Sequence, residues 1–267
     1  MNKSPLVCVV IATMNAREHL QECLDSIYEQ TNASWEIVLI DGGSTDGTQE
    51  LICGNAGRIK HWVSEPDRGV YDAWNKALPH VSAKWVMFLG ADDRLWNENV
   101  LKDIAPLLED PELDNRLVYG RVAFTAHDGG ILSQEGQPWD QIAKRFRKEM
   151  CIPHQGVFHR SDIFRETVFD LKFRYAGDYA LLLGEVIRHP PIFHDLCIAA
   201  WRQGGLTSSA GQSINVLREF RVARAQNGFT NTHPYWIEFK AWLKYWLVRL
   251  FGAAPAQRVL DVYRRLR

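Results

Sequence analysis

The chain has 267 residues, of which 46% are hydrophobic and 24% charged, and its formal net charge is −1. These values are typical of a globular protein, and the length suits one large α/β domain with a small appendage. The near-neutral charge excludes a general polyanion binder, and no basic block is interleaved with aromatic residues, so no nucleic-acid partner is expected. The five cysteines form no C-x-x-C pair, which predicts small buried thiols in a reducing cytosol rather than a zinc site.

The N-terminal segment carries no sign of secretion. Residues 1–8 lack the separate apolar region and the cleavage site of a signal peptide. No apolar run reaches the about 18 residues that are needed to span a bilayer. We therefore expect a cytoplasmic protein, either soluble or peripheral on the inner face of the cell membrane.

Apolar runs alternate with helical patterns over residues 1–115. Buried strands are predicted at 6–12, 36–40, 60–64 and 84–89, and helices are predicted to begin near residues 15, 48 and 70. Asn15 and Glu18 have the spacing of a helix capping box. Strands that alternate with helices predict an α/β fold built of βαβ units, with a Rossmann-like, mostly parallel twisted sheet flanked by helices.

The alternation breaks after residue 115. Strand-like segments at 117–124 and 131–133 flank Asp128-Gly129, which is a hairpin signal. A helix at 140–148, a short strand at 156–159 and a helix at 179–188 are predicted to follow. Residues 116–212 are therefore expected to form a mixed α+β half of the same domain, and residues 213–267 a C-terminal helical extension.

The segment 234–267 has the pattern of amphipathic helices. Trp236, Trp242 and Trp246 share one apolar face, and arginines cluster near the C-terminus. One interpretation is packing against the core or a homodimer seam. The other is a helix on an anionic membrane surface, with tryptophans at the interface and arginines on lipid phosphates.

Polar side chains stand at the predicted ends of the first four strands. In open α/β sheets, ligands bind beyond the carboxyl ends of the strands, so these side chains predict one site at that edge. They are Thr13 and Asn15, Asp41, Glu65 and Asp67, and Asp92 and Asp93.

Asp92 and Asp93 are adjacent carboxylates that follow an apolar strand. They repel each other, and a hard divalent cation, Mg²⁺ or Mn²⁺, relieves this repulsion because it prefers oxygen ligands. Such an ion would neutralise the charge that builds on a diphosphate leaving group. The alternative interpretation is an Asx turn or a helix cap.

Two segments rich in turn residues add candidates. Residues 41–47 would let a ligand approach the backbone, but they match neither a dinucleotide fingerprint nor a P-loop. In the second segment, Arg68 has the planar fork that suits a phosphate. Tyr71, Asp72 and Asn75 fall on or near one face of the helix that follows. A solvated helix start also explains the acidic residues.

Further candidates lie in the second half of the chain, at His154-Gln155 and at Asp178. Asp178 follows two small residues and opens a predicted helix. A carboxylate in that position is suited to general-base catalysis or to helix capping, and the spacing leaves both interpretations open.

Together these segments resemble the family 2 glycosyltransferases with the GT-A fold. The resemblance extends over roughly residues 5–210, and its closest match is to the subgroup that makes bacterial exopolysaccharide, O-antigen and colanic acid-type polymers. The segments that carry it are 9–15, 40–48, 64–76, 88–93, 119–120, 154–155, 177–179 and 204–205.

The resemblance implies a function and a set of roles. The enzyme would move a sugar from a nucleotide-sugar donor to a hydroxyl of a glycan or lipid-linked glycan, with inversion and with Mg²⁺ or Mn²⁺, in surface polysaccharide biosynthesis. Asp178 would be the catalytic base, and Asp93 with Asp92 would hold the metal. The donor nucleotide would be bound by Thr13, Asn15, Asp41, Glu65, Asp67, Arg68 and Asp92. The residues near the diphosphate or the acceptor would be His154, Gln155, Tyr71, Asp72 and Asn75.

Two positions depart from the family pattern. Gly42 stands where many members have an aspartate that pairs with uracil, so uridine specificity is not implied, and Gly90 stands where a fuller D-x-D motif begins. Two other functions predict different sequence features. A non-catalytic nucleotide- or carbohydrate-binding protein would be expected to lack one of the three key aspartates. A sugar nucleotidyltransferase would have a glycine-rich loop after the first strand, and residues 13–18 contain no glycine.

Overall fold

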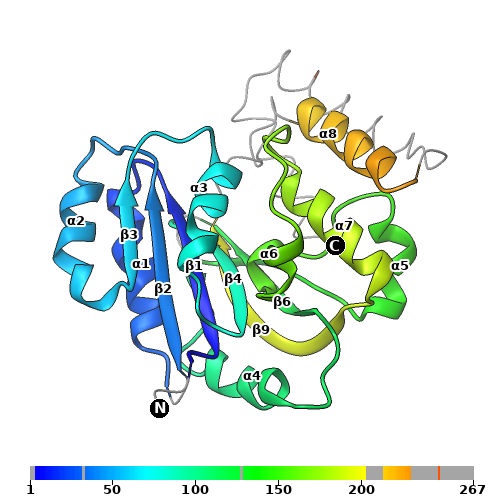
Figure 1. Ribbon diagram of the computed structural model, residues 1–267, viewed down its shortest axis with the longest axis horizontal. Coiled ribbons are helices and arrows are strands. Elements are labelled where there is room, and N and C mark those ends of the chain that lie inside the picture. The colour runs from blue at the N-terminus through cyan, green and yellow to red at the C-terminus, as the bar shows by residue number, and fades with distance from the viewer. Residues whose placement is uncertain (1–3, 32–33, 127–128, 203–212, 230–245, 247–267) are drawn as a thin grey trace.

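The computed structural model describes residues 4–31, 34–126, 129–202, 213–229 and 246 (Figure 1). Within these residues a single sheet has the strand order β3-β2-β1-β4-β8-β6-β9-β5, and β7 pairs with β6 outside this path. The strands are β1 (Val7–Thr13), β2 (Trp35–Asp41), β3 (His61–Ser64), β4 (Trp85–Gly90), β5 (Arg94–Leu95), β6 (Leu117–Thr125), β7 (Ile131–Glu135), β8 (Val157–Arg160) and β9 (Ile192–Arg202).

The first four strands in the order, β3, β2, β1 and β4, are all parallel. Thr13 lies opposite Asp41, and Asp41 lies opposite Ser64, so the polar strand ends do meet at one edge. Three of the four strands continue one residue further than predicted, to Thr13, Asp41 and Gly90. The polar residues Thr13 and Asp41 therefore complete their strands and are held by the sheet itself.

Helices cover both faces of the sheet (Figure 1). Alternate residues of β1 enter two separate cores: Cys8 and Val10 pack with α3 and α7, while Val9 and Ile11 pack with α1 and α4. A strand that is apolar on both faces is the pattern of a buried parallel sheet. The helices are α1 (Arg17–Tyr28), α2 (Thr48–Asn55), α3 (Val70–Ala77), α4 (Val100–Glu109), α5 (Trp139–Phe146), α6 (Ile163–Glu166), α7 (Gly177–Arg188) and α8 (Ser213–Gln226).

The second half continues the same sheet with mixed pairing. β8 joins β4 and β6 in antiparallel pairs, β6 and β7 form the predicted hairpin, and β9 runs parallel to β6. The α/β fold class and the mixed character of this half are confirmed. The division at residues 115 and 212 stays a prediction.

Several local expectations need correction. Asn15 does not cap α1: the helix begins at Arg17, its N-cap is Ala16, and no side chain caps it. Asn15 instead has a φ of 50° and accepts a hydrogen bond from the Thr45 backbone on the neighbouring loop. Cys8 and Cys23 are buried as predicted, but Cys53 is exposed.

The interpretations of the C-terminal segment 234–267 concern residues that, apart from Trp246, lie outside those described. Asp128 and the pair at 204–205 also lie outside them. In the part of the chain that is described, no helix is long and apolar enough to cross a membrane.

Candidate active site

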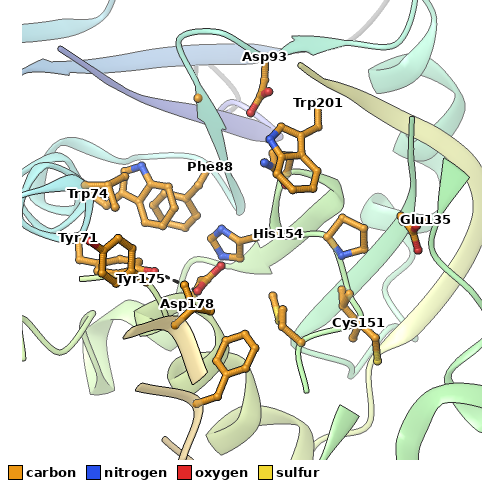
Figure 2. Close-up of a pocket in the computed structure, with 18 of the residues that line it drawn as sticks. Tyr71, Trp74, Phe88, Asp93, Glu135, Cys151, His154, Tyr175, Asp178 and Trp201 are labelled. Carbon is orange, nitrogen blue, oxygen red and sulfur yellow. Dashed lines mark hydrogen bonds between the residues drawn. The ribbon is translucent and has the colours of Figure 1, made fainter. Parts of the chain in front are cut away.

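A cavity of about 480 Å³ opens at the carboxyl end of β4, between α3 and α7 (Figure 2). Aromatic side chains form its inner wall, and carboxylates stand at its opposite ends. The predicted site residues that line it are Tyr71, Asp92, Asp93, His154, Gln155 and Asp178. The predicted residues that do not line it are Thr13, Asn15, Asp41, Glu65, Asp67, Arg68, Asp72 and Asn75.

Asp93 marks one end of the cavity. It is 4% exposed, and its carboxylate accepts a hydrogen bond of 3.2 Å from the backbone N–H of Arg202 on β9. Burial and the nearby charge of Asp92 raise the pKa of Asp93 to about 8. A carboxylate that resists ionisation here needs a compensating positive charge to stay ionised at neutral pH.

The chemistry of this carboxylate pair suits a divalent cation. A Cβ at Gly90 would lie 2.8 Å from an Asp92 oxygen and 2.9 Å from an Asp93 oxygen, so glycine leaves room for both carboxylates to fold back over the strand end. Among the described residues no group of three His, Cys, Asp or Glu side chains forms a complete metal cage. Oxygen atoms of a ligand such as a diphosphate would have to complete the coordination.

Asp178 marks the other end of the cavity, in the first turn of α7. Its Oδ1 accepts hydrogen bonds from the Tyr71 hydroxyl at 3.0 Å and from the Tyr179 backbone N–H at 2.8 Å. Burial raises the pKa of Asp178, and the two hydrogen bonds oppose this rise. The N-cap of α7 is Ala176, so the capping interpretation of Asp178 is wrong.

Tyr71 fixes the position of the Asp178 carboxylate. Its ring packs against Gly177, where a Cβ would lie 2.9 Å from the ring, and it stacks on Phe169 with 5.6 Å between centroids. Burial and the Asp178 carboxylate raise the pKa of Tyr71 well above its ordinary value. The hydroxyl therefore keeps its proton and acts as a donor to the carboxylate.

His154 lies on the cavity wall between the two ends, on a short 3₁₀ turn before β8 (Figure 2). It is 6% exposed, and its ring packs on Phe88 and Trp74 with centroid distances of 5.5 and 5.1 Å. Burial lowers the pKa of His154 to about 3. The imidazole is therefore neutral at physiological pH.

Asp41 is directed away from the cavity and into its own loop. Its oxygens accept hydrogen bonds from the backbone N–H groups of Gly43 (3.2 Å) and Ser44 (2.9 Å) and from the Ser64 hydroxyl (2.5 Å), and the Ser44 hydroxyl also donates to it. Ser44 in turn accepts a bond of 2.7 Å from the Asn15 backbone. Asp41 thus holds the loops after β1 and β2 in one arrangement.

The polar residues on and before α3 have different partners. Arg68 and Asp72 form an ion pair of 2.9 Å, and the Arg68 backbone also donates to Asp72. Asn75 binds the backbone of Phe169 in both directions, at 2.8 and 3.0 Å. Of Tyr71, Asp72 and Asn75, Tyr71 lines the cavity, and the polar groups of the other two bind within the protein. Their place near the diphosphate or the acceptor stays a prediction.

Gly42 leaves a space that Asp67 fills. A Cβ at position 42 would lie 2.7 Å from an Asp67 carboxylate oxygen. An aspartate at position 42 would therefore need Asp67 to move. The departure from the family pattern at Gly42 is matched by the placement of Asp67.

Sequence reasoning missed several residues that line the cavity. Trp74 lies one turn after Tyr71 on α3, and this spacing was a usable signal. Arg145, Tyr175, Trp201 and Phe220 come from α5, the loop before α7, β9 and α8. No sequence signal placed them, because their approach depends on the antiparallel second half.

Comparison with known proteins identifies the family. The model of the family described as "Glycosyl transferase family 2" matches residues 8–164. A "PGL/p-HBAD biosynthesis glycosyltransferase" of Mycobacterium bovis is 33% identical over 180 residues, which are 66% of this chain and 68% of that protein. The hyaluronan synthase of Pasteurella multocida is 28% identical over 192 residues, which are 68% of this chain and 19% of that protein.

Two solved structures illustrate the shared fold. S. aureus TarS 1-349 in complex with UDP-GlcNAc has a TM-score of 0.62 and 17% identity, over 85% of this chain and 72% of that one. The match spans 41% of a longer TarS chain. Mannosyltransferase PcManGT from Pyrobaculum calidifontis, in complex with GDP-Man and Mn²⁺, has a TM-score of 0.59 and 18% identity, over 99% of this chain and 81% of that one. The GT-A fold expected from the sequence is confirmed, and the chain is an enzyme that belongs to glycosyltransferase family 2.

Proposed function

We propose that this enzyme transfers a sugar from a nucleoside-diphosphate sugar to a hydroxyl of a glycan or lipid-linked glycan, with inversion, in the synthesis of a surface polysaccharide or glycolipid. One observation carries the proposal: two buried carboxylates of raised pKa, Asp93 and Asp178, stand at opposite ends of one cavity. A displacement needs these two functions, a stabilised leaving group on one side and a base on the other.

At the donor end, Asp93 and Asp92 would hold Mg²⁺ or Mn²⁺. A bound ion would supply positive charge to the departing diphosphate. The burial of Asp93 beside a second carboxylate supports this assignment, since both effects raise the pKa of Asp93 and a bound cation would oppose them. The Mn²⁺ present with GDP-Man in the mannosyltransferase structure agrees with it.

The nucleoside would lie along the same edge of the sheet, over the ends of β1, β2 and β3. Asp41 would act there by holding the shape of its loop. The other residues assigned to the donor nucleotide are Thr13, Asn15, Glu65, Asp67 and Arg68. Of these, Arg68 is largely exposed and is oriented by Asp72, which suits a contact with a diphosphate.

At the acceptor end, Asp178 would take the proton from the attacking hydroxyl. The oxygen forms its bond to the anomeric carbon while the bond to the diphosphate breaks on the opposite side, so the configuration inverts. The raised pKa of Asp178 brings its basicity closer to neutral pH, and the Tyr71 hydroxyl holds one of its oxygens in place.

The acceptor would enter the same cavity. Met150, Ile152 and Phe220 also line it and add apolar surface, which suits a lipid or aromatic carrier next to the reacting hydroxyl. The mycobacterial relative is named for the biosynthesis of PGL/p-HBAD, and this name agrees with a glycolipid acceptor. We place the enzyme at the cytoplasmic face of the cell membrane, where such a carrier is accessible.

The decisive experiment pairs a donor assay with one variant. Purified protein, Mn²⁺ or Mg²⁺ and a panel of nucleotide-sugars are scored for release of nucleoside diphosphate and of pyrophosphate. Asp178→Asn should bind the donor with nearly unchanged affinity, and its transfer rate should fall about 10²- to 10⁴-fold. Pyrophosphate release, or transfer by the variant at near-parent rates, would contradict the proposal.

Asp140→Asn is the matched control. Asp140 is also the second residue of its helix, and it accepts a hydrogen bond of 3.0 Å from the next backbone N–H, as Asp178 does at 2.8 Å. It is exposed and does not line the cavity. This variant should keep the parent activity.

A further inference from the structure

One side chain of α8 binds the main chain that leads into α7. The Glu219 carboxylate accepts hydrogen bonds from three successive backbone N–H groups, those of Arg174 (3.0 and 3.1 Å), Tyr175 (2.7 Å) and Ala176 (2.9 Å). Hydrogen bonds to an ionised carboxylate are stronger than those between neutral groups. Glu219 therefore joins this segment firmly to a helix that lies 43 to 45 residues further along the chain.

Ala176 connects this contact to the helix that carries Asp178. Its N–H donates to Glu219, and its carbonyl accepts the first hydrogen bond of α7, from the Ala180 N–H at 2.9 Å. The first N–H groups of a helix have no partner within the helix, and negative charge is favoured at this end. Glu219 supplies both the acceptor and the charge for α7, although it belongs to another helix.

Asp178 follows two residues after Ala176 and is held from two sides. On the side of α3, the Tyr71 hydroxyl donates to the Asp178 carboxylate at 3.0 Å, and the Tyr71 ring packs against Gly177. On the side of α8, Glu219 binds the backbone N–H of Ala176. The carboxylate is thus fixed by α3, and the main chain that carries it is fixed by α8.

Other side chains dock α8 against the rest of the protein, where it lies beside α7 (Figure 1). The Phe220 ring packs on the Tyr179 ring with 4.7 Å between centroids. Arg224 is 2% exposed and donates to the Lys148 carbonyl at 2.6 Å. Because these contacts hold the helix in place, the hydrogen bonds of Glu219 can act on the segment before α7.

A general base must lie within hydrogen-bond reach of the proton that it takes, and a displacement of about 1 Å can cost about a hundredfold in rate. We propose that Glu219 is a positioning residue: by holding residues 174–176, it keeps Asp178 where the acceptor hydroxyl can reach it. This inference rests on the proposed function and makes α8 a part of the active site. Glu219 itself does not line the cavity, so its effect on transfer would pass through Asp178.

Glu219→Ala tests the proposal through a split between catalysis and binding. Its kcat should fall about ten- to hundredfold, while calorimetry of UDP and GDP with Mn²⁺ should give the parent affinity. Asn227→Ala is the matched control: it removes a contact of 3.4 Å from the end of α8 to the Ala180 carbonyl on α7, and it should keep the parent kcat. A folded Glu219→Ala variant with the parent kcat, or with an equal loss of kcat and nucleotide affinity, would overturn the proposal.

A double-mutant cycle with Asp178→Asn separates positioning from a general defect. If Glu219 acts through Asp178, Glu219→Ala should cause no further loss of rate in the Asp178→Asn background, because that variant already lacks the base. An equal fold-loss in both backgrounds would reject the positioning role. Transfer by Asp178→Asn at near-parent rates would instead reject the base, and the inference would then fall together with the proposed function.

Hydrogen exchange gives a structural readout of the same variant. In Glu219→Ala, the amides of residues 174–176 should exchange faster, while those of α7 stay protected as in the parent. Loss of protection over the whole of α7 would mean that Glu219 secures the packing of the two helices, against the proposal. If Glu219→Ala does not fold, Glu219→Gln takes its place. Its NH₂ group cannot accept the Arg174 N–H, so kcat should fall about threefold at unchanged nucleotide affinity, and a parent kcat would contradict the proposal.

Discussion

Two regions at the same edge of the sheet differ in how far the protein itself compensates their polar groups. In the loop at the end of β2, Asp41 accepts hydrogen bonds from two backbone N–H groups and two serine hydroxyls, so the region satisfies itself. In the cavity beyond β4, Asp93 is buried beside a second carboxylate, and burial together with this charge raises its pKa to about 8. The loop at the end of β2 keeps its shape through its own hydrogen bonds, whereas the cavity leaves polar groups that a ligand would compensate.

The largest effect should come from the cavity, with Asp93→Asn. Loss of this carboxylate removes charge that would hold the cation, and we expect kcat/KM to fall roughly a thousandfold, since a metal contributes several kcal/mol to stabilising the transition state. Steady-state assays and calorimetry of UDP or GDP with Mn²⁺ measure the two losses. Asp195→Asn, which breaks the exposed ion pair with Arg121, is the control and should behave as the parent. Metal-dependent binding that survives in Asp93→Asn would refute the assignment.

Substitutions in the loop at the end of β2 should lower the stability of the protein. Asp41→Asn replaces one accepting oxygen by a donor among groups that already donate, so we expect the free energy of unfolding to fall by about 2–3 kcal/mol. Ser64→Ala removes one of the bonds to Asp41 and should cost about 1 kcal/mol. Urea denaturation measures both. An Asp41→Asn variant of parent stability that no longer binds nucleotide would break the comparison, because the carboxylate would then act on the ligand and not on the loop.

Tyr71→Phe tests how the cavity sets the pKa of Asp178, the proposed base. The Tyr71 hydroxyl donates to the ionised Asp178, which lowers the pKa of this carboxyl against the effect of burial. Losing that bond raises the pKa of Asp178 further, and a base works only when it is deprotonated, so the acidic limb of the kcat profile should move to higher pH. Activity should therefore fall on the acidic side of the profile and recover at higher pH.

A control tyrosine separates this effect from packing. The Tyr119 hydroxyl donates to the Gln137 carbonyl, and Tyr119 does not line the cavity. Tyr119→Phe should leave the pH profile of kcat in place. A Tyr71→Phe variant whose activity falls equally at every pH would show that Tyr71 positions Asp178 without changing its pKa.

The parallel half of the fold was predictable because its signals are local. Each of β1, β2 and β4 contains an apolar run that is followed by a turn, so the strand ends and the pair Asp92-Asp93 could be placed from the sequence. β9 was missed, because Ile192–Arg202 is only partly buried over most of its length and its pairing with β6 joins segments more than 70 residues apart.

The hydrogen-bond partners and orientation of a side chain were harder to predict than the position of its residue in the fold. Spacing left Asp178 open between a base and a cap, and the observed start of α7 excluded the cap. Asp41 was expected at the site, yet its orientation depends on Ser64 of the next strand. The packing of Trp74 against His154 joins residues that are 80 positions apart, which no local pattern encodes.

The smallest effect on activity is expected for a substitution at Asp72, on α3. Its carboxylate orients Arg68 through the backbone N–H at 3.0 Å and the guanidinium at 2.9 Å, and the Arg68 side chain is 73% exposed. An exposed ion pair four residues apart contributes little to stability, so Asp72→Asn should leave the melting temperature nearly unchanged. If Arg68 contacts the diphosphate, losing its orientation should raise the donor KM about two- to threefold with kcat unchanged. Arg68→Lys keeps the charge without the planar fork and should give a similar rise. Unchanged KM in both variants would show that Arg68 lies outside the donor site. Its ion pair with Asp72 would then be a contact within the protein that takes no part in binding.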